Sequence, residues 1–114
     1  MQPAAPGLPE TPRAAATVVL LRDSTAGPEV LLLRRNAQAS NMAGVYVFPG
    51  GKLDPGERPE DALIRELHEE LGIETWSSCL APLTFASHAY DDFHLLMPLF
   101  ACRRWQGIPH PHEG

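Results

Sequence analysis

The sequence lacks the features that mark several classes of protein. No apolar run approaches the roughly 18 residues that a membrane-spanning helix needs, and the first 13 residues, MQPAAPGLPETPR, do not form a secretory signal. Basic residues are the minority, with 9 Lys and Arg against 14 Asp and Glu and a formal net charge of −5. We therefore expect a cytoplasmic protein that binds neither a membrane nor a nucleic-acid polymer.

Cysteine is also scarce. Cys79 and Cys102 are the only two, and neither their number nor their spacing is typical of a disulfide framework or a metal site. On two paired strands they would be diagonal neighbours, about 7 Å apart, which is awkward for a disulfide bond. We expect two free thiols.

The length of 114 residues allows one domain. Residues 1–13 have proline at every third position (Pro3, Pro6, Pro9 and Pro12) among small residues, so they are predicted to form a disordered tail. Residues 14–114 are predicted to form the folded domain.

Hydrophobic patterning predicts a mixed α and β domain. Strands are expected at residues 14–22, 29–35, 45–48, 79–90 and 93–105, with the first two paired as a hairpin. Loops are expected at 36–44 and 106–114, with a break at Pro49-Gly50-Gly51. One helix is predicted at 58–71, because Pro59 suits its first position and Gly72 the residue after its end.

The negative charge is concentrated in and around this helix. Residues 54–74 contain eight acidic residues and two arginines, a net charge of −6, and the rest of the chain carries +1. Glu66, Glu69 and Glu70 are spaced i, i+3, i+4, so they project from one side of the helix. Arg65 can reach Glu69, but one arginine cannot neutralise three carboxylates. Converging oxygen ligands suit Mg²⁺ or Mn²⁺, with a phosphate completing the coordination.

The spacing of chemically distinctive residues continues on both sides of the helix. From Gly51 the sequence is GKLDPGERPEDALIRELHEELGI, with five residues before Glu57 and seven more before Arg65. This segment resembles the Nudix box, the signature of the Nudix hydrolases, at every defined position. The stretches LLLRR, VYVFPGGKLDPGE and LTFASHAYDDFHLLMPLFACRRWQGIP resemble the MutT-like branch, which includes oxidised-nucleotide and CTP pyrophosphohydrolases.

The resemblance implies a fold and an activity. The fold would be an α/β (α+β) Nudix-like α/β/α sandwich with a mixed sheet. The activity would be Mg²⁺-dependent hydrolysis of a nucleoside triphosphate to its monophosphate and pyrophosphate, with Mn²⁺ as an alternative metal. One alternative is hydrolysis of another diphosphate, such as ADP-ribose, a dinucleoside polyphosphate or CoA. The other is a truncated, catalytically silent domain that binds a nucleotide or a partner protein.

The resemblance also assigns roles to residues. The implied metal-binding residues are Gly51 (through its carbonyl), Glu66, Glu69, Glu70 and Glu113. Arg65 and Glu57 would orient these carboxylates, and the general base would be Glu66 or Glu113. The implied substrate-binding residues are Arg35 for phosphate, Tyr46 and Phe48 for the base, and Gly50 and Lys52.

Three features depart from the family pattern. The resemblance implies a further strand and a second covering helix after Glu113-Gly114, so we expect an uncovered sheet face that promotes self-association. Tyr46-Val47 stands where many MutT-like chains have Trp-Glu, and the loop at 36–44 is one residue longer. Both argue against assuming specificity for oxidised guanine. The sequence leaves the oligomeric state open.

Overall fold

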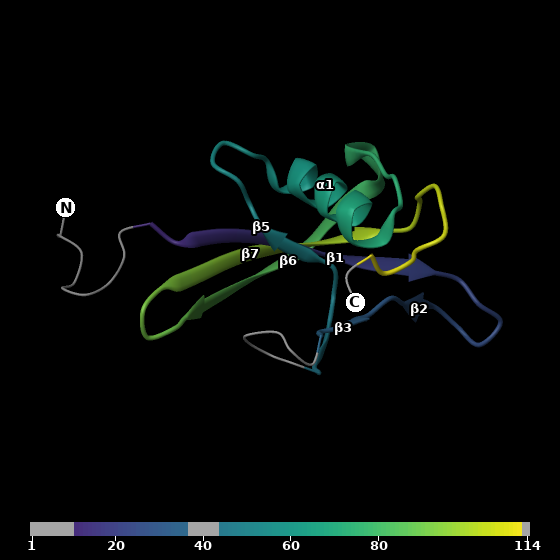
Figure 1. Ribbon diagram of the computed structural model, residues 1–114, viewed down its shortest axis with the longest axis horizontal. Coiled ribbons are helices and arrows are strands. Elements are labelled where there is room, and N and C mark those ends of the chain that lie inside the picture. The colour runs from purple at the N-terminus through teal and green to yellow at the C-terminus, as the bar shows by residue number, and fades with distance from the viewer. Residues whose placement is uncertain (1–10, 37–43, 113–114) are drawn as a thin grey trace.

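The computed structural model describes residues 11–36 and 44–112 of the chain. Its main sheet is mixed, as predicted, and β1 (Arg13–Arg22) lies at its centre (Figure 1). β1 pairs in parallel with β7 (His94–Cys102), and β7 pairs antiparallel with β6 (Leu80–Ala89). The other edge of β1 pairs antiparallel with β5 (Gly50–Lys52) and β2 (Glu29–Val30).

The single strand predicted at residues 29–35 is wrong, because this segment divides between two sheets. After β2, Leu31 still donates a hydrogen bond to the Leu20 carbonyl, but β3 (Leu33–Arg34) pairs instead with β4 (Tyr46–Val47). The apolar run Val30–Leu33 is continuous, so its sequence contains no mark of the point where the backbone changes partner.

The predicted break at Pro49-Gly50-Gly51 is also wrong, since Gly50 begins β5. Gly50 has φ 150°, and a Cβ atom there would overlap the Ala16 carbonyl oxygen on β1. Glycine is required at this point because the two backbones approach so closely. The sequence signal for a turn was therefore a signal for close strand packing.

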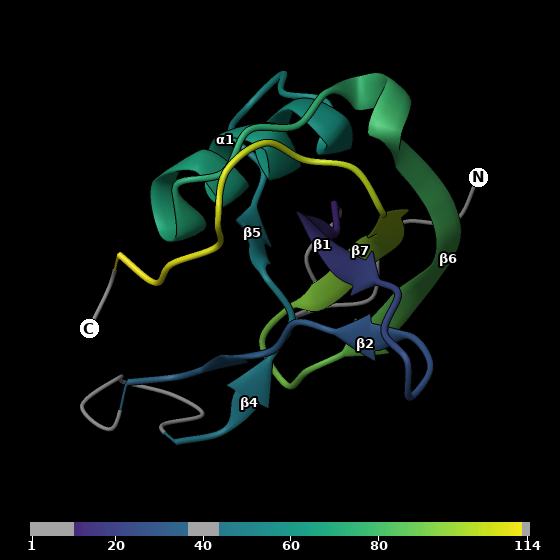
Figure 2. The ribbon, with the colours of Figure 1, turned by 90° about the vertical axis from the view of Figure 1, so that its right-hand side faces the viewer.

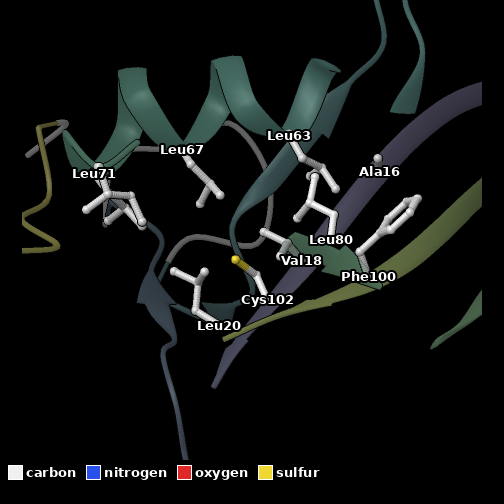
Figure 3. Close-up of a cluster of buried hydrophobic side chains, with 10 residues drawn as sticks. Ala16, Val18, Leu20, Leu63, Leu67, Leu71, Leu80, Phe100 and Cys102 are labelled. Atoms are coloured by element: carbon white, nitrogen blue, oxygen red, sulfur yellow. The ribbon is translucent and has the colours of Figure 1, made fainter. Parts of the chain in front are cut away.

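The predicted helix is present as α1 (Pro59–Leu71), with Arg58 at its N-cap. Gly72 ends it in the left-handed conformation, φ 70°, and donates a hydrogen bond to the His68 carbonyl. The helix lies on one face of the sheet, where three helix leucines meet three β1 side chains (Figure 3). These six residues, each at most 1% exposed, are Ala16, Val18, Leu20, Leu63, Leu67 and Leu71. Burying each leucine contributes about 1.5–3 kcal/mol relative to leaving it in water.

The β6–β7 hairpin contributes Leu80, Phe100 and Cys102 to this core, but it also leaves large apolar side chains exposed. Leu83, Phe85 and Leu96 are 56%, 65% and 41% exposed. Within the described residues α1 is the one α-helix, and neither it nor the short 3-10 helix η1 (Ser77–Cys79) is long and apolar enough to cross a membrane. Both cysteines are free thiols, as expected. The self-association expected from exposed apolar surface stays a prediction.

Candidate active site

The site begins at the turn that joins β5 to α1. The Glu57 amide donates to the Asp54 carbonyl at 3.0 Å, and the Asp54 amide donates to Glu57 Oε1 at 2.9 Å. Pro55 and Gly56 form the middle of this turn, and Gly56 has φ 78°. The turn therefore brings Glu57 back toward the helix.

Arg65 is the centre of the acidic cluster. Its Nε and Nη2 atoms donate to the two carboxylate oxygens of Glu57, at 3.1 and 3.0 Å. Its Nη1 atom donates to Glu66 Oε1 at 3.1 Å and lies 3.6 Å from Glu69 Oε2. The Lys52 carbonyl accepts a further bond from Nη2 at 3.5 Å. Asp54 Oδ2 also lies 3.7 Å from Nη2. One guanidinium group thus forms ion pairs with four of the eight acidic residues between positions 54 and 74.

These bonds shift the protonation equilibria of both partners. The hydrogen bonds from Arg65, helped by the Asp54 amide, lower the pKa of Glu57 below its ordinary 4.5. The same hydrogen bonds from Arg65 to Glu57 raise the pKa of Arg65, against the opposing effect of burial. Both groups are therefore held in their charged forms.

The Glu66 carboxylate lies directly against Gly51. A Cβ atom at Gly51 would stand 2.8 Å from Glu66 Oε1, so any larger residue would displace this carboxylate. The structure thereby brings two predicted metal-binding residues together, and their oxygen donors fit a hard divalent cation such as Mg²⁺. Within residues 11–36 and 44–112, however, no three acidic, histidine or cysteine side chains converge on one point.

A cleft of about 590 Å³ opens beside the C-terminal end of α1. Five of the predicted site residues line it, namely Arg35, Tyr46, Phe48, Gly50 and Glu70. Glu66, Glu69 and Lys52 do not. The predicted site therefore has two adjoining parts. One is the Arg65 network, which consists of Arg65 and the carboxylates of Glu57, Glu66 and Glu69, and the other is the cleft. The two parts meet on α1, where Glu69 of the network is followed by Glu70 of the cleft.

Some cleft residues were missed in the sequence. Leu31 and Leu33 line the cleft, but in the sequence they belong to an ordinary apolar strand. Pro109 and Pro111 also line it, but in the sequence they fall in the predicted final loop, without a predicted role. Their alternation along the chain was the signal that could have found them. The predicted site residue Glu113 lies outside the described residues.

The sequence was compared with models of known protein families, and the match agrees with the acidic helix, Gly51 and the adjoining cleft. The family model of the NUDIX domain matches residues 11–114. The chain belongs to the Nudix family. Nudix hydrolases generally use divalent metal ions, which agrees with the oxygen donors at Gly51 and Glu66.

Individual relatives of this Nudix domain are MutT-like. This chain is 38% identical over 86 residues to an 8-oxo-dGTP diphosphatase from Escherichia coli K12, and the match covers 75% of this chain and 64% of that protein. A CTP pyrophosphohydrolase from the same strain is 54% identical over 46 residues, covering 40% of this chain and 33% of that protein. The Nudix domain thus spans less than two thirds of the length of these relatives.

A solved structure confirms the predicted fold class. The MutT NUDIX hydrolase from Burkholderia pseudomallei superposes with a TM-score of 0.76 at 31% identity, covering 91% of this chain and 76% of that one. The mixed sheet with α1 on one face is therefore the Nudix fold, and the resemblance noted in the sequence is confirmed.

Proposed function

We propose that this Nudix domain hydrolyses nucleoside triphosphates to the monophosphate and pyrophosphate with Mg²⁺, or Mn²⁺ in its place. The observation that carries the proposal is the position of the Arg65 network beside a cleft that contains both Glu70 and Arg35. The names of the relatives, 8-oxo-dGTP diphosphatase and CTP pyrophosphohydrolase, support the same class of substrate.

The proposed metal-binding residues are the Gly51 carbonyl and the carboxylates of Glu66, Glu69, Glu70 and Glu113. A divalent ion bound by them would screen the charge of the phosphates and acidify a water molecule. Arg65 acts as a positioning residue, because its hydrogen bonds hold the carboxylates of Glu57 and Glu66 in fixed directions.

The reaction needs a carboxylate to accept a proton from water. As the water oxygen bonds to the α or β phosphorus, the bond from that phosphorus to the oxygen that bridges the two breaks. The electron pair of this bond leaves on the bridging oxygen, with pyrophosphate or the nucleoside monophosphate as the leaving group. Glu66 is the proposed acceptor of the water proton, with Glu113 as the other candidate. Phosphoryl transfer depends mostly on positioning and charge stabilisation, so the residues required are few.

The cleft provides the proposed substrate contacts. The guanidinium of Arg35 is suited to hold a phosphate through two parallel hydrogen bonds. Tyr46 and Phe48, 62% and 37% exposed, offer aromatic surface for a base. Gly50 lines the same cleft. Lys52 is proposed to contact the phosphates from outside it.

The test is a product analysis by ion-exchange chromatography after incubation with Mg²⁺. The panel contains the normal and 8-oxo (d)NTPs, ADP-ribose and a CoA ester, and Glu70→Gln is run beside the wild type. We expect monophosphate and pyrophosphate from triphosphates, and far less of both from the variant in the same time. Cleavage of ADP-ribose or the CoA ester alone would move the assignment to another Nudix substrate class. A folded sample that cleaves nothing would favour a binding role.

A further inference from the structure

The last described segment of the chain, residues 106–112, lies along the C-terminal end of α1. We call this segment the terminal strap; in Figure 2 it belongs to the yellow segment that leaves β7 and passes α1 toward the C-terminus. Its first residue, Gln106, exchanges two backbone hydrogen bonds with Glu74, of 2.8 and 3.0 Å. The strap is therefore anchored at its start to the residues that follow the helix.

Two further hydrogen bonds anchor the strap to the helix itself. The His110 amide donates to the Leu71 carbonyl at 3.0 Å, and the His112 amide donates to the Glu70 carbonyl at 2.9 Å. Carbonyls in the last turn of a helix have no partner within the helix, so the strap satisfies two of them.

The ring of His112 packs on Gly72. A Cβ atom at Gly72 would stand 2.8 Å from His112 Nε2, so glycine is needed here for the strap as well as for its positive φ. The strap is thus docked through backbone hydrogen bonds and one close side-chain contact, at the helix end that also carries Glu70.

The alternation of residues along the strap decides what it presents to the cleft. The amides of His110 and His112 bind the helix, while the intervening prolines, Pro109 and Pro111, line the cleft. Proline has a fixed φ and no N–H group. Two such residues form a stiff apolar surface with no donor to satisfy.

Aromatic side chains contribute to the same cleft from a distant part of the sequence. Tyr46 belongs to β4 and Phe48 follows it, and both line the cleft together with Pro109 and Pro111. A planar ring bound between the strap and these aromatic residues would have apolar surface on both faces.

We propose that Pro109 and Pro111 determine nucleobase specificity, by forming the wall against which the base packs opposite Tyr46 and Phe48. The inference rests on the proposed function only for its choice of a nucleotide as the ligand. Because the strap also binds the Glu70 carbonyl, the base wall and that carboxylate belong to one unit. A base that fits the wall is thereby set at a fixed distance from Glu70.

The test measures binding without catalysis, by calorimetric titration of dAMP, dGMP, dCMP and dTMP, with pyrophosphate as a ligand that has no base. Pro111→Gly removes the ring and stiffness at an exposed position, whereas Pro111→Val retains bulk. Pro12→Ala is the control, because Pro12 is exposed and outside the cleft. Melting temperatures verify that each variant is folded.

We expect Pro111→Gly to weaken the best-bound monophosphate about tenfold and to change the order of the four bases. Pro111→Val should recover part of the loss, and pyrophosphate affinity should stay within about twofold. An unchanged order, an equal loss for pyrophosphate, or a wild type that binds none of the monophosphates would overturn the proposal.

Hydrolysis assays on the same proteins separate this inference from the proposed function. If the wild type hydrolyses no triphosphate while Pro111→Gly still changes the order of binding, the function fails and the base wall stands. If the wild type is active and Pro111→Gly keeps its order of preference among bases, the base wall fails and the function stands.

Discussion

The Arg65 network comes from one continuous stretch between Lys52 and Glu69, whereas the cleft is assembled from segments far apart in the chain. Arg65, Glu57 and Glu66 lie within 10 residues of each other in the sequence, and the Arg65 side chain donates hydrogen bonds to both carboxylates. The cleft instead combines residues 31–36, residues 46–48, Gly50, Pro109 and Pro111 with the end of α1. The network can be recognised by spacing alone, while the cleft exists only after the strands and the terminal strap have assembled.

The Arg65 network and the cleft are also stabilised by different interactions. The network depends on charge-assisted hydrogen bonds, and its members are partly shielded, with Glu57 and Glu66 side chains 16% and 17% exposed. The cleft depends on where backbones pack, above all at Gly50 and along the strap. Changes of charge should therefore affect the first part, and changes of backbone or shape the second.

The largest effect is expected for Glu70→Gln, at the point where the two parts meet. The change removes a negative charge from the cleft at nearly constant size, so kcat/KM for the best triphosphate should fall by about 10²–10⁴. Steady-state kinetics with Mg²⁺ measure this. Glu74→Gln, an exposed acid beyond the helix end, is the control and should stay within about twofold of wild type. A loss below tenfold for Glu70→Gln would remove Glu70 from the proposed site.

The next effect is on folding and concerns Gly50. Gly50→Ala places a Cβ against the Ala16 carbonyl at a positive φ, so the free energy of unfolding should fall by about 3 kcal/mol or more. Urea denaturation followed by circular dichroism measures it. Gly27→Ala is the matched control, because Gly27 also has a positive φ, 111°, but no atom within 4 Å of the added Cβ. Its cost should be about 1 kcal/mol; equal losses would show that the close packing of β5 on β1 is unimportant.

A smaller effect on activity is expected for Arg65→Lys. Lysine keeps the charge but cannot bind both oxygens of Glu57 and reach Glu66 together, so activity should fall about 10–100-fold. Raising the Mg²⁺ concentration should recover part of this loss if Arg65 acts by holding the carboxylates. Arg58→Lys provides the comparison, since Arg58 binds only the exposed Asp61 in the described residues. Equal activity of the two variants would contradict the positioning role.

The smallest effect is a pH dependence of stability at Glu57. Because Arg65 lowers the pKa of Glu57 below 4.5 in the folded state, its contribution is complete above that value. It is lost as pH falls through the lowered pKa. Melting temperatures of wild type and Glu57→Gln should therefore differ at pH 7 and converge in strong acid. The difference should shrink at pH 7 when both proteins also carry Arg65→Lys; a gap independent of pH and of Arg65 would contradict this account.

Parts of the molecule could be predicted because they depend on local rules. The limits of α1 follow from Pro59 and Gly72, and its buried face from the spacing of Leu63, Leu67 and Leu71. The two wrong predictions of strands have one cause, which is a backbone segment that pairs with a strand that the local sequence does not indicate. The division of 29–35 between β2 and β3, and the strand at Gly50, are both pairings with residues distant in sequence.

The sequence by itself determined the Nudix family, the helix and the cluster of acids around Arg65, because fixed spacings on one helix and one turn place those side chains together. The tertiary structure decided that Glu70 belongs to the cleft and that Pro109 and Pro111 form part of its wall. The physical reason is that helix spacing acts over a few residues, while a cleft is defined by which remote backbones bind each other. Here two backbone hydrogen bonds hold the strap at the end of α1 and so place its prolines beside Glu70.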